Sequence, residues 1–227
     1  MEISYQHNSP LFKSRCPEIR LGQDVCHLVN TEFPHYSLYK FKSRIEEGIL
    51  RSVVKPTAIM DIMDKHKDIN PNNYDNPISY FRNLFSSIKE HHYFNCHESA
   101  LLSELILKLN GIKNSYTAWI QKGDAKANHF VCLFNRDGSE YSPNNKDSEI
   151  IIVDPWADLC DFKDNVLNTY KNIWSEELKP DILPENYKDD VYSIEKVSDI
   201  SLSNEFLEEI KTSYPNLILK NIPQKKR

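Results

Sequence analysis

The chain has 227 residues, with 40% hydrophobic and 27% charged side chains, a formal net charge of -5 and a pI near 5.9. This composition is that of a globular protein, and the acidic balance argues against nucleic-acid binding through phosphate neutralisation. Residues 1–20 lack the apolar segment of a signal peptide, and no apolar run reaches the roughly 18 residues of a membrane span. We therefore expect a cytoplasmic protein without a membrane span.

The chain contains five cysteines and no CxxC spacing. An odd number of cysteines without paired spacing predicts neither a disulfide framework nor a zinc ribbon. We therefore expect free thiols in a reducing compartment. The five residues are Cys16, Cys26, Cys96, Cys132 and Cys160.

The N-terminal third is predicted to be mainly helical. Residues 1–34 are polar and interrupted by prolines, so we predict a loop there with a short helix over 21–29. Apolar residues at helical spacing predict three longer helices, over residues 36–54, 57–66 and 78–90. We predict that residues 1–90 form a helical extension packed on a core formed by residues 91–227.

The next predicted helix begins at a cysteine. Leucine, isoleucine and alanine recur at helical spacing after Cys96, and Gly111 stands where a helix ends. Unpaired N–H groups and the positive end of the helix dipole favour a thiolate at such a position. Cys96 is therefore a candidate nucleophile.

Two buried strands follow, with the sequences NHFVCLFN and EIIIVDPW. The first has apolar residues at both its odd and its even positions, which is typical of a strand buried on both faces. His129 lies at its start. The second ends at Asp154, because Pro155 cannot donate to a central ladder. Asp154 could orient the imidazole of His129, which is the role of the third residue in a set of nucleophile, base and orienting group.

The C-terminal part is predicted to add further elements around this core. Helical spacing predicts helices over residues 161–174 and 203–213, and alternation predicts an edge strand over residues 191–197. The polar insert between the two buried strands, residues 136–148, contains a glycine and a proline. It is predicted to be a mobile surface loop suited to docking a protein partner.

The order Cys96, His129 and Asp154, with CHESALLSELILKLNGI leading through YTAWI to HFV and VDPW, resembles the core of the transglutaminase-like branch of the papain-like cysteine enzymes. The resemblance implies an α+β fold, in which a helix bearing the cysteine packs on an antiparallel sheet bearing the histidine and the aspartate. It also implies an acyl-enzyme mechanism on protein amides. This scheme requires neither a metal nor a cofactor.

Glutamine deamidation or transamidation is the expected reaction. Bulky Trp119, Phe130 and Trp156 near the three candidate catalytic residues would narrow the entrance to the site, so that it admits one side chain. A cysteine protease, which must lay an extended peptide across the site, is the alternative. The backbone N–H of Cys96 and the side chain of Asn95 are candidates for the oxyanion hole.

Two other classes of function stay open. The segment HHYFNCH offers His91, His92, Cys96 and His97 as zinc ligands, but adjacent histidines on a helix point to different faces and no second ligand pair follows. A non-catalytic protein-binding module on the same fold is the other possibility, which a close sulfur–imidazole contact would disfavour. The composition, rich in Asn, Lys and Ile with 5 glycines, resembles that of bacterial effectors and implies a host protein as a target.

Overall fold

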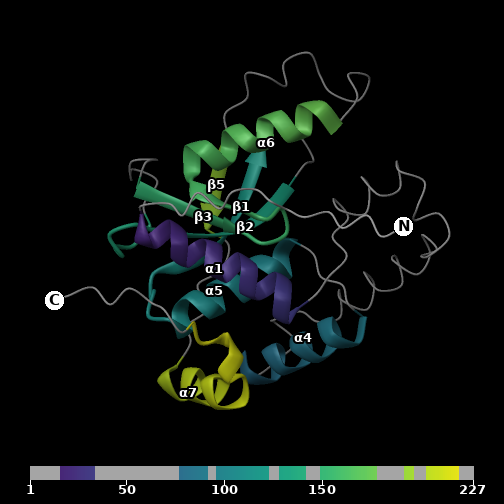
Figure 1. The fold of residues 1–227 in the computed structure, drawn as a ribbon, viewed down its shortest axis with the longest axis vertical. Coiled ribbons are helices and arrows are strands. Elements are labelled where there is room, and N and C mark those ends of the chain that lie inside the picture. Colours follow the sequence, from purple (N-terminus) through teal and green to yellow (C-terminus); the bar gives the residue numbers. More distant parts are fainter. Residues whose placement is uncertain are drawn as a thin grey trace, which may run out of the picture.

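Our computed structural model describes residues 16–33, 77–91, 96–122, 128–141, 149–177, 192–196 and 203–219. The fold is α+β, as predicted, with a five-stranded sheet and helices on both of its faces (Figure 1). The strands are β1 (Ser115–Lys122), β2 (Asn128–Asn135), β3 (Ile150–Asp154), β4 (Leu159–Phe162) and β5 (Tyr192–Lys196). The α-helices are α1 (Pro17–Glu32), α4 (Pro77–His91), α5 (Cys96–Leu109), α6 (Lys163–Glu177) and α7 (Asn204–Ser213), followed by the 3-10 helix η5 (Pro215–Leu217).

The strand order is β4, β3, β2, β1, β5, and all neighbouring strands are antiparallel. Because β2 and β3 run in opposite directions, the start of β2 and the end of β3 lie at the same end of the sheet. His129 is near the start of β2, and Asp154 is the last residue of β3. Side chains alternate along a strand, so the pairing of Leu133 with Ile152 places His129 and Asp154 on the same face.

Helices cover both faces of the sheet (Figure 1). Helix α6 contacts β3 and β4 on one face, and α5 contacts β1, β2 and β3 on the other, where α1 contacts β3 and β4. Helices α4 and α7 contact each other and lie farthest from α6. The cluster between the sheet and α6 consists of Ile120, Val131, Ile152, Val166, Leu167 and Tyr170.

Helix α5 is buried around most of its circumference, which is typical of a helix with apolar residues on all sides. It ends at Gly111, whose φ of 92° suits a residue without a Cβ. There the N–H of Ile112 donates to the carbonyl of Leu107 at 2.9 Å, and the N–H of Gly111 donates to that of Lys108 at 3.1 Å. These bonds satisfy the last carbonyls of the helix and direct the chain into β1.

A buried carboxylate attaches α5 to β1. Oε2 of Glu104 accepts hydrogen bonds of 2.8 Å from both the backbone N–H and the hydroxyl of Thr117. Its other oxygen lies 2.9 Å from Nζ of Lys108, one turn along the helix. A charged group in the interior requires such partners. The arrangement fixes α5 against the sheet, and with it the position of Cys96.

Helix α1 corrects one prediction. The sequence predicts a loop over residues 1–34 with a short helix at 21–29, but residues 17–32 form a continuous helix. Pro17 does not interrupt it, because a proline in the first turn of a helix removes no required hydrogen bond. The helix packs on β3, β4 and α5 within the main core. Its buried side chains include Ile19, Leu21, Val25, Cys26 and Val29.

Other predicted elements lie close to their predicted positions. The observed counterparts of the elements predicted over residues 78–90, 191–197 and 203–213 are α4, β5 and α7. The helix predicted over 161–174 begins at Lys163, because residues 159–162 pair with β3 as β4. The helices predicted over 36–54 and 57–66 lie outside the described residues.

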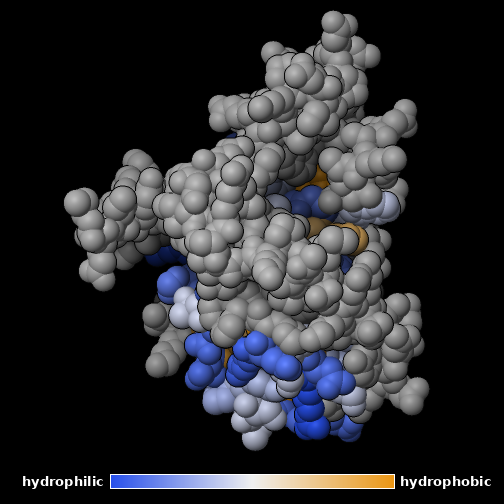
Figure 2. All heavy atoms as spheres, turned by 90° about the vertical axis from the view of Figure 1, so that its right-hand side faces the viewer, coloured by the Kyte–Doolittle hydropathy of each residue, from blue (hydrophilic) through white to orange (hydrophobic). Residues whose placement is uncertain are grey.

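The layer formed by α4 and α7 is apolar inside and polar outside. The rings of Phe81 and Phe206 lie 5.7 Å apart, and those of Phe85 and Tyr214 lie 4.6 Å apart. Figure 2 shows a mainly hydrophilic surface at the base of the molecule, where these helices lie in Figure 1.

No helix in the described part of the chain is long and apolar enough to cross a membrane. The division into residues 1–90 and 91–227 stays a prediction.

Candidate active site

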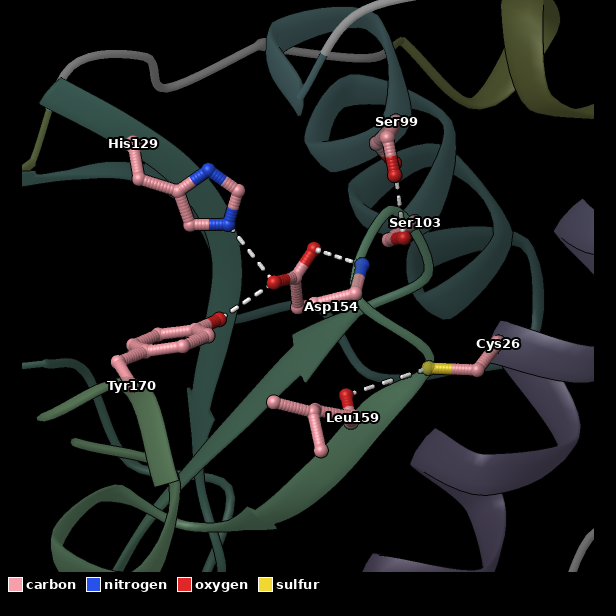
Figure 3. A network of polar contacts seen from close by, with 8 residues as sticks. Cys26, Ser99, Ser103, His129, Asp154, Leu159 and Tyr170 are labelled. Carbon is pink, nitrogen blue, oxygen red and sulfur yellow. Dashed lines mark hydrogen bonds and ion pairs between the residues drawn. The ribbon is translucent and has the colours of Figure 1, made fainter. Parts of the chain in front are cut away.

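His129 and Asp154 form a buried pair at one end of the sheet (Figure 3). Nε2 of His129 lies 2.7 Å from Oδ2 of Asp154, and only 4% and 1% of the two residues are exposed. A carboxylate bound to one imidazole nitrogen fixes the orientation of the ring and the position of its proton. Asp154 therefore holds Nε2 as a donor and leaves Nδ1 for another partner.

Two further donors hold the carboxylate of Asp154. The hydroxyl of Tyr170, on α6, donates to Oδ2, the oxygen that also accepts from His129 (Figure 3). The backbone N–H of Ala157 donates to Oδ1 at 3.3 Å. Ala157 belongs to the turn between β3 and β4, which the N–H of Asp158 closes by donating to the carbonyl of Pro155 at 3.2 Å. The buried carboxylate is thus bound by donors from three segments.

Cys96 is the first residue of α5. Its side chain is half-buried, and its interaction with the imidazole of His129 contributes to the raised pKa of that ring. Because Asp154 holds Nε2, the ring nitrogen that remains for the sulfur is Nδ1. The contacts thus run from thiol through imidazole to carboxylate, in the order that a nucleophile, a base and an orienting group require.

The surroundings of His129 raise its pKa. Burial alone favours the neutral imidazole and lowers the pKa, but the charge of Asp154 and the hydrogen bonds to Asp154 and Cys96 outweigh burial and raise the pKa from 6.5 to about 10. The imidazole is therefore protonated at neutral pH. A positive charge beside a cysteine favours its thiolate form.

Two aromatic rings enclose the imidazole. The ring of Trp156 lies 5.2 Å from that of His129, and the ring of Tyr170 lies 5.4 Å away at an interplanar angle of 85°. Burial and the charge of Asp154 raise the pKa of Tyr170 well above its ordinary value, so its hydroxyl keeps the proton that it donates. Exclusion of water by these rings strengthens the interaction of His129 with Asp154.

A second group of aromatic rings adjoins the site. His97 follows Cys96 on α5, and its ring lies 4.7 Å from that of Phe130, the residue after His129. Phe130 is in turn stacked on Trp119 of β1, with centroids 6.2 Å apart and an interplanar angle of 7°. Burial lowers the pKa of His97, although Glu98 opposes the shift, so the ring is neutral at neutral pH and packs as an aromatic group.

The structure brings Cys96, His129 and Asp154 together, and it places Trp156 against the imidazole. Trp119 contacts Phe130, whose position in β2 faces away from the side of the sheet that carries His129. Asn95 lies outside the described residues, so its role in an oxyanion hole stays a prediction.

Tyr170 is a member of the site that the sequence does not identify. The sequence predicts it only as a buried residue of a helix. A buried tyrosine usually has a partner for its hydroxyl, which is the one available signal. The sequence does not indicate that the partner is Asp154, 16 positions away.

The predicted zinc alternative involves residues that face different partners. The sulfur of Cys96 contacts His129, whereas the ring of His97 packs on Phe130. His92 lies outside the described residues. Within the part of the chain that is described, no group of three or more His, Cys, Asp or Glu side chains is placed to hold a metal ion.

The chain matches no family model, no curated protein and no solved structure. What the protein does is therefore inferred from the site itself.

Proposed function

We propose that the protein is a cysteine-dependent acyl-transfer enzyme that acts on protein amides, with a core of the transglutaminase-like, papain-like kind. The observation that carries the proposal is the continuous contact from Cys96 through His129 to Asp154. Cys96 is the nucleophile, His129 transfers protons, and Asp154 orients the imidazole.

Differences among the cysteines support a reactive role for Cys96. Cys26 and Cys132 are buried, and burial raises the pKa of both thiols well above the ordinary value. Such thiols are inert at neutral pH. Cys96 is half-buried, begins a helix and contacts a protonated imidazole. These are the surroundings in which a thiolate is stabilised and accessible.

In the first half of the reaction, the thiolate of Cys96 attacks the carbonyl carbon of an amide, so that a C–S bond forms. The imidazolium of His129 gives its proton to the amide nitrogen as the C–N bond breaks. Ammonia or an amine leaves, and a thioester and a neutral imidazole remain. Asp154 stays ionised throughout and holds the ring.

In the second half, the neutral imidazole of His129 takes a proton from water or from an incoming amine, which attacks the thioester carbonyl. The C–S bond breaks, and the sulfur of Cys96 leaves as a thiolate. The thiolate of Cys96 and the imidazolium of His129 are then restored. Water yields deamidation or hydrolysis, and a lysine amine yields transamidation.

The proposed substrate group is the side-chain amide of a protein glutamine. The half-buried ring of Trp156 against His129, together with the ring of His97 next to Cys96, supports an entrance bounded by aromatic surface. Such an entrance suits a single extended side chain. Cleavage of a main-chain peptide bond is the alternative reaction at the same residues.

The test compares wild type with Cys96→Ala on proteins of a cell extract, with and without an added primary amine. Mass spectrometry should find conversion of glutamine to glutamate, or incorporation of the amine, only with wild type. Cys16→Ala is the matched control, because Cys16 is also half-buried but its thiol contacts Glu18 at 3.2 Å. This control should retain the activity.

Two outcomes would overturn parts of the proposal. New chain termini that depend on Cys96, without either glutamine modification, would identify a protease. The absence of any modification or cleavage that depends on Cys96 would favour a non-catalytic protein-binding module.

A further inference from the structure

One carboxylate oxygen is shared between two donors from different elements. Oδ2 of Asp154 accepts from Nε2 of His129, on β2, and from the hydroxyl of Tyr170, on α6. The ring of Tyr170 also packs edge-on against the imidazole. Figure 3 shows both contacts converging on the same oxygen. Tyr170 therefore touches both members of the pair.

Packing alone does not require the hydroxyl of Tyr170. Its neighbours in the cluster under α6, such as Val166 and Leu167, are apolar. A phenylalanine at position 170 would fill nearly the same volume, and a buried hydroxyl is unfavourable without a hydrogen bond. The specific contribution of the tyrosine is its bond to Asp154.

We infer that Tyr170 is a positioning residue of this site: it orients the carboxylate of Asp154 toward His129 and weakens the stabilisation of the imidazolium charge by that carboxylate. The inference rests on the proposed function. Two donors on one oxygen share its negative charge, so each is bound less strongly than it would be alone. A proton held less tightly by His129 is transferred more readily to a leaving amine.

The ionisable groups around this pair come from several elements. Burial raises the pKa of Cys26 well above its ordinary value, so this thiol stays neutral through neutral pH. The carboxylate of Asp158 is bound by the side-chain amide of Asn30 at 3.4 Å. The groups that interact with Asp154 or His129 include Cys96 on α5, Cys26 on α1 and Tyr170 on α6. Asp158, in the turn after β3, acts on Cys26.

The test uses Tyr170→Phe in the full chain and follows the titration of His129 by NMR of labelled histidine side chains, assigned with His129→Gln. Loss of the hydroxyl should raise the titration midpoint by about one pH unit, which is a tenfold change in proton affinity. Glutamine turnover should fall by about tenfold, as for loss of a hydrogen bond to a charged group.

Two variants separate positioning from packing. Val166→Ala removes buried volume from the same helix face but no hydrogen-bond donor to Asp154, and it should leave the His129 midpoint unchanged while lowering the melting temperature. Fluorotyrosine at position 170 retains the shape and donates more strongly. It should move the midpoint downward, opposite to Tyr170→Phe.

Each outcome bears on one claim. A midpoint in Tyr170→Phe equal to that of wild type, or an equal shift in Val166→Ala, would overturn the role of Tyr170. Because the titration needs no substrate, it tests Tyr170 even if no amide is turned over. Activity that depends on Cys96, together with an unshifted midpoint, would leave the proposed function intact and remove only this inference.

Discussion

Nε2 of His129 lies 2.7 Å from Oδ2 of Asp154, although 25 positions separate the two residues. Antiparallel pairing of β2 with β3 brings them to the same end of the sheet. The N-terminus of α5 adds Cys96 to the pair. The reactivity of that thiol is therefore the most direct property to measure.

Iodoacetamide at neutral pH should label Cys96 before the other cysteines. Cys96 is half-buried at the start of a helix and lies next to a candidate base, His129. Burial raises the pKa of Cys26, Cys132 and Cys160, so these three thiols stay protonated. Peptide mapping by mass spectrometry at short reaction times gives the order. Preferential labelling of Cys16, which is also half-buried, would contradict the nucleophile assignment.

Substitutions in the trio should reduce turnover in a defined order. Cys96→Ala and His129→Ala should abolish it, because they remove the bond-forming and proton-transferring groups. Asp154→Asn should retain a remnant, with a loss of up to about 10⁴-fold, because it removes only orientation and charge. The double variant Cys96→Ala with Asp154→Asn should have a turnover no lower than that of Cys96→Ala alone.

Circular dichroism and thermal melting serve as controls for folding in this series. An Asp154→Asn protein with native spectra and full turnover would remove Asp154 from the site. A reduced but measurable rate, with the fold intact, is the expected result.

The positions of Cys96, His129 and Asp154 in the fold could be predicted because each lies at or next to the boundary of an element, and boundaries leave local signals. Gly111 indicates the end of the helix that Cys96 begins, and Pro155 indicates the end of the strand that Asp154 closes. Tyr170 lies inside a helix, where nothing local identifies its acceptor.

Other features depend on contacts that only the folded chain provides. A glutamate within a helix is expected on the surface, yet Glu104 is fully buried, because Thr117 and Lys108 supply its partners. Likewise, α1 contains polar residues and Gly22, which weaken its helical pattern. The surface of β3 and β4 stabilises it as a helix.

The pair of His129 with Asp154 should make stability fall at alkaline pH. His129 titrates near 6.5 when unfolded and near 10 when folded, so between these values the folded state binds more protons. The stabilising contribution is complete below about pH 6.5 and is lost as pH rises to about 10. The total is on the order of a few kcal/mol.

Urea unfolding of wild type and Asp154→Asn across this pH window measures the effect. Without the carboxylate charge the pKa of His129 should fall, so the pH dependence assigned to this pair should disappear in the variant. If both proteins lose stability in parallel as the pH rises, the pair of His129 with Asp154 is not the source of the pH dependence.

The contact of α1 with the sheet leaves no room for a side chain at Gly22. A Cβ there would lie 2.3 Å from Sγ of Cys160 and 3.0 Å from Cγ2 of Val153. Alanine favours the helix by up to about 1 kcal/mol, but overpacking costs about 1–3 kcal/mol. Gly22→Ala should therefore lower the free energy of unfolding, by up to about 2 kcal/mol.

A double-mutant cycle with Cys160→Ala tests this explanation. Removing the sulfur removes the closest clash, so Gly22→Ala should cost much less in the Cys160→Ala background than in wild type. An equal cost in both backgrounds would mean that backbone effects at position 22 dominate. Since Val153 directly precedes Asp154, displacement of β3 by the added methyl group should also lower turnover, and Cys160→Ala should restore it.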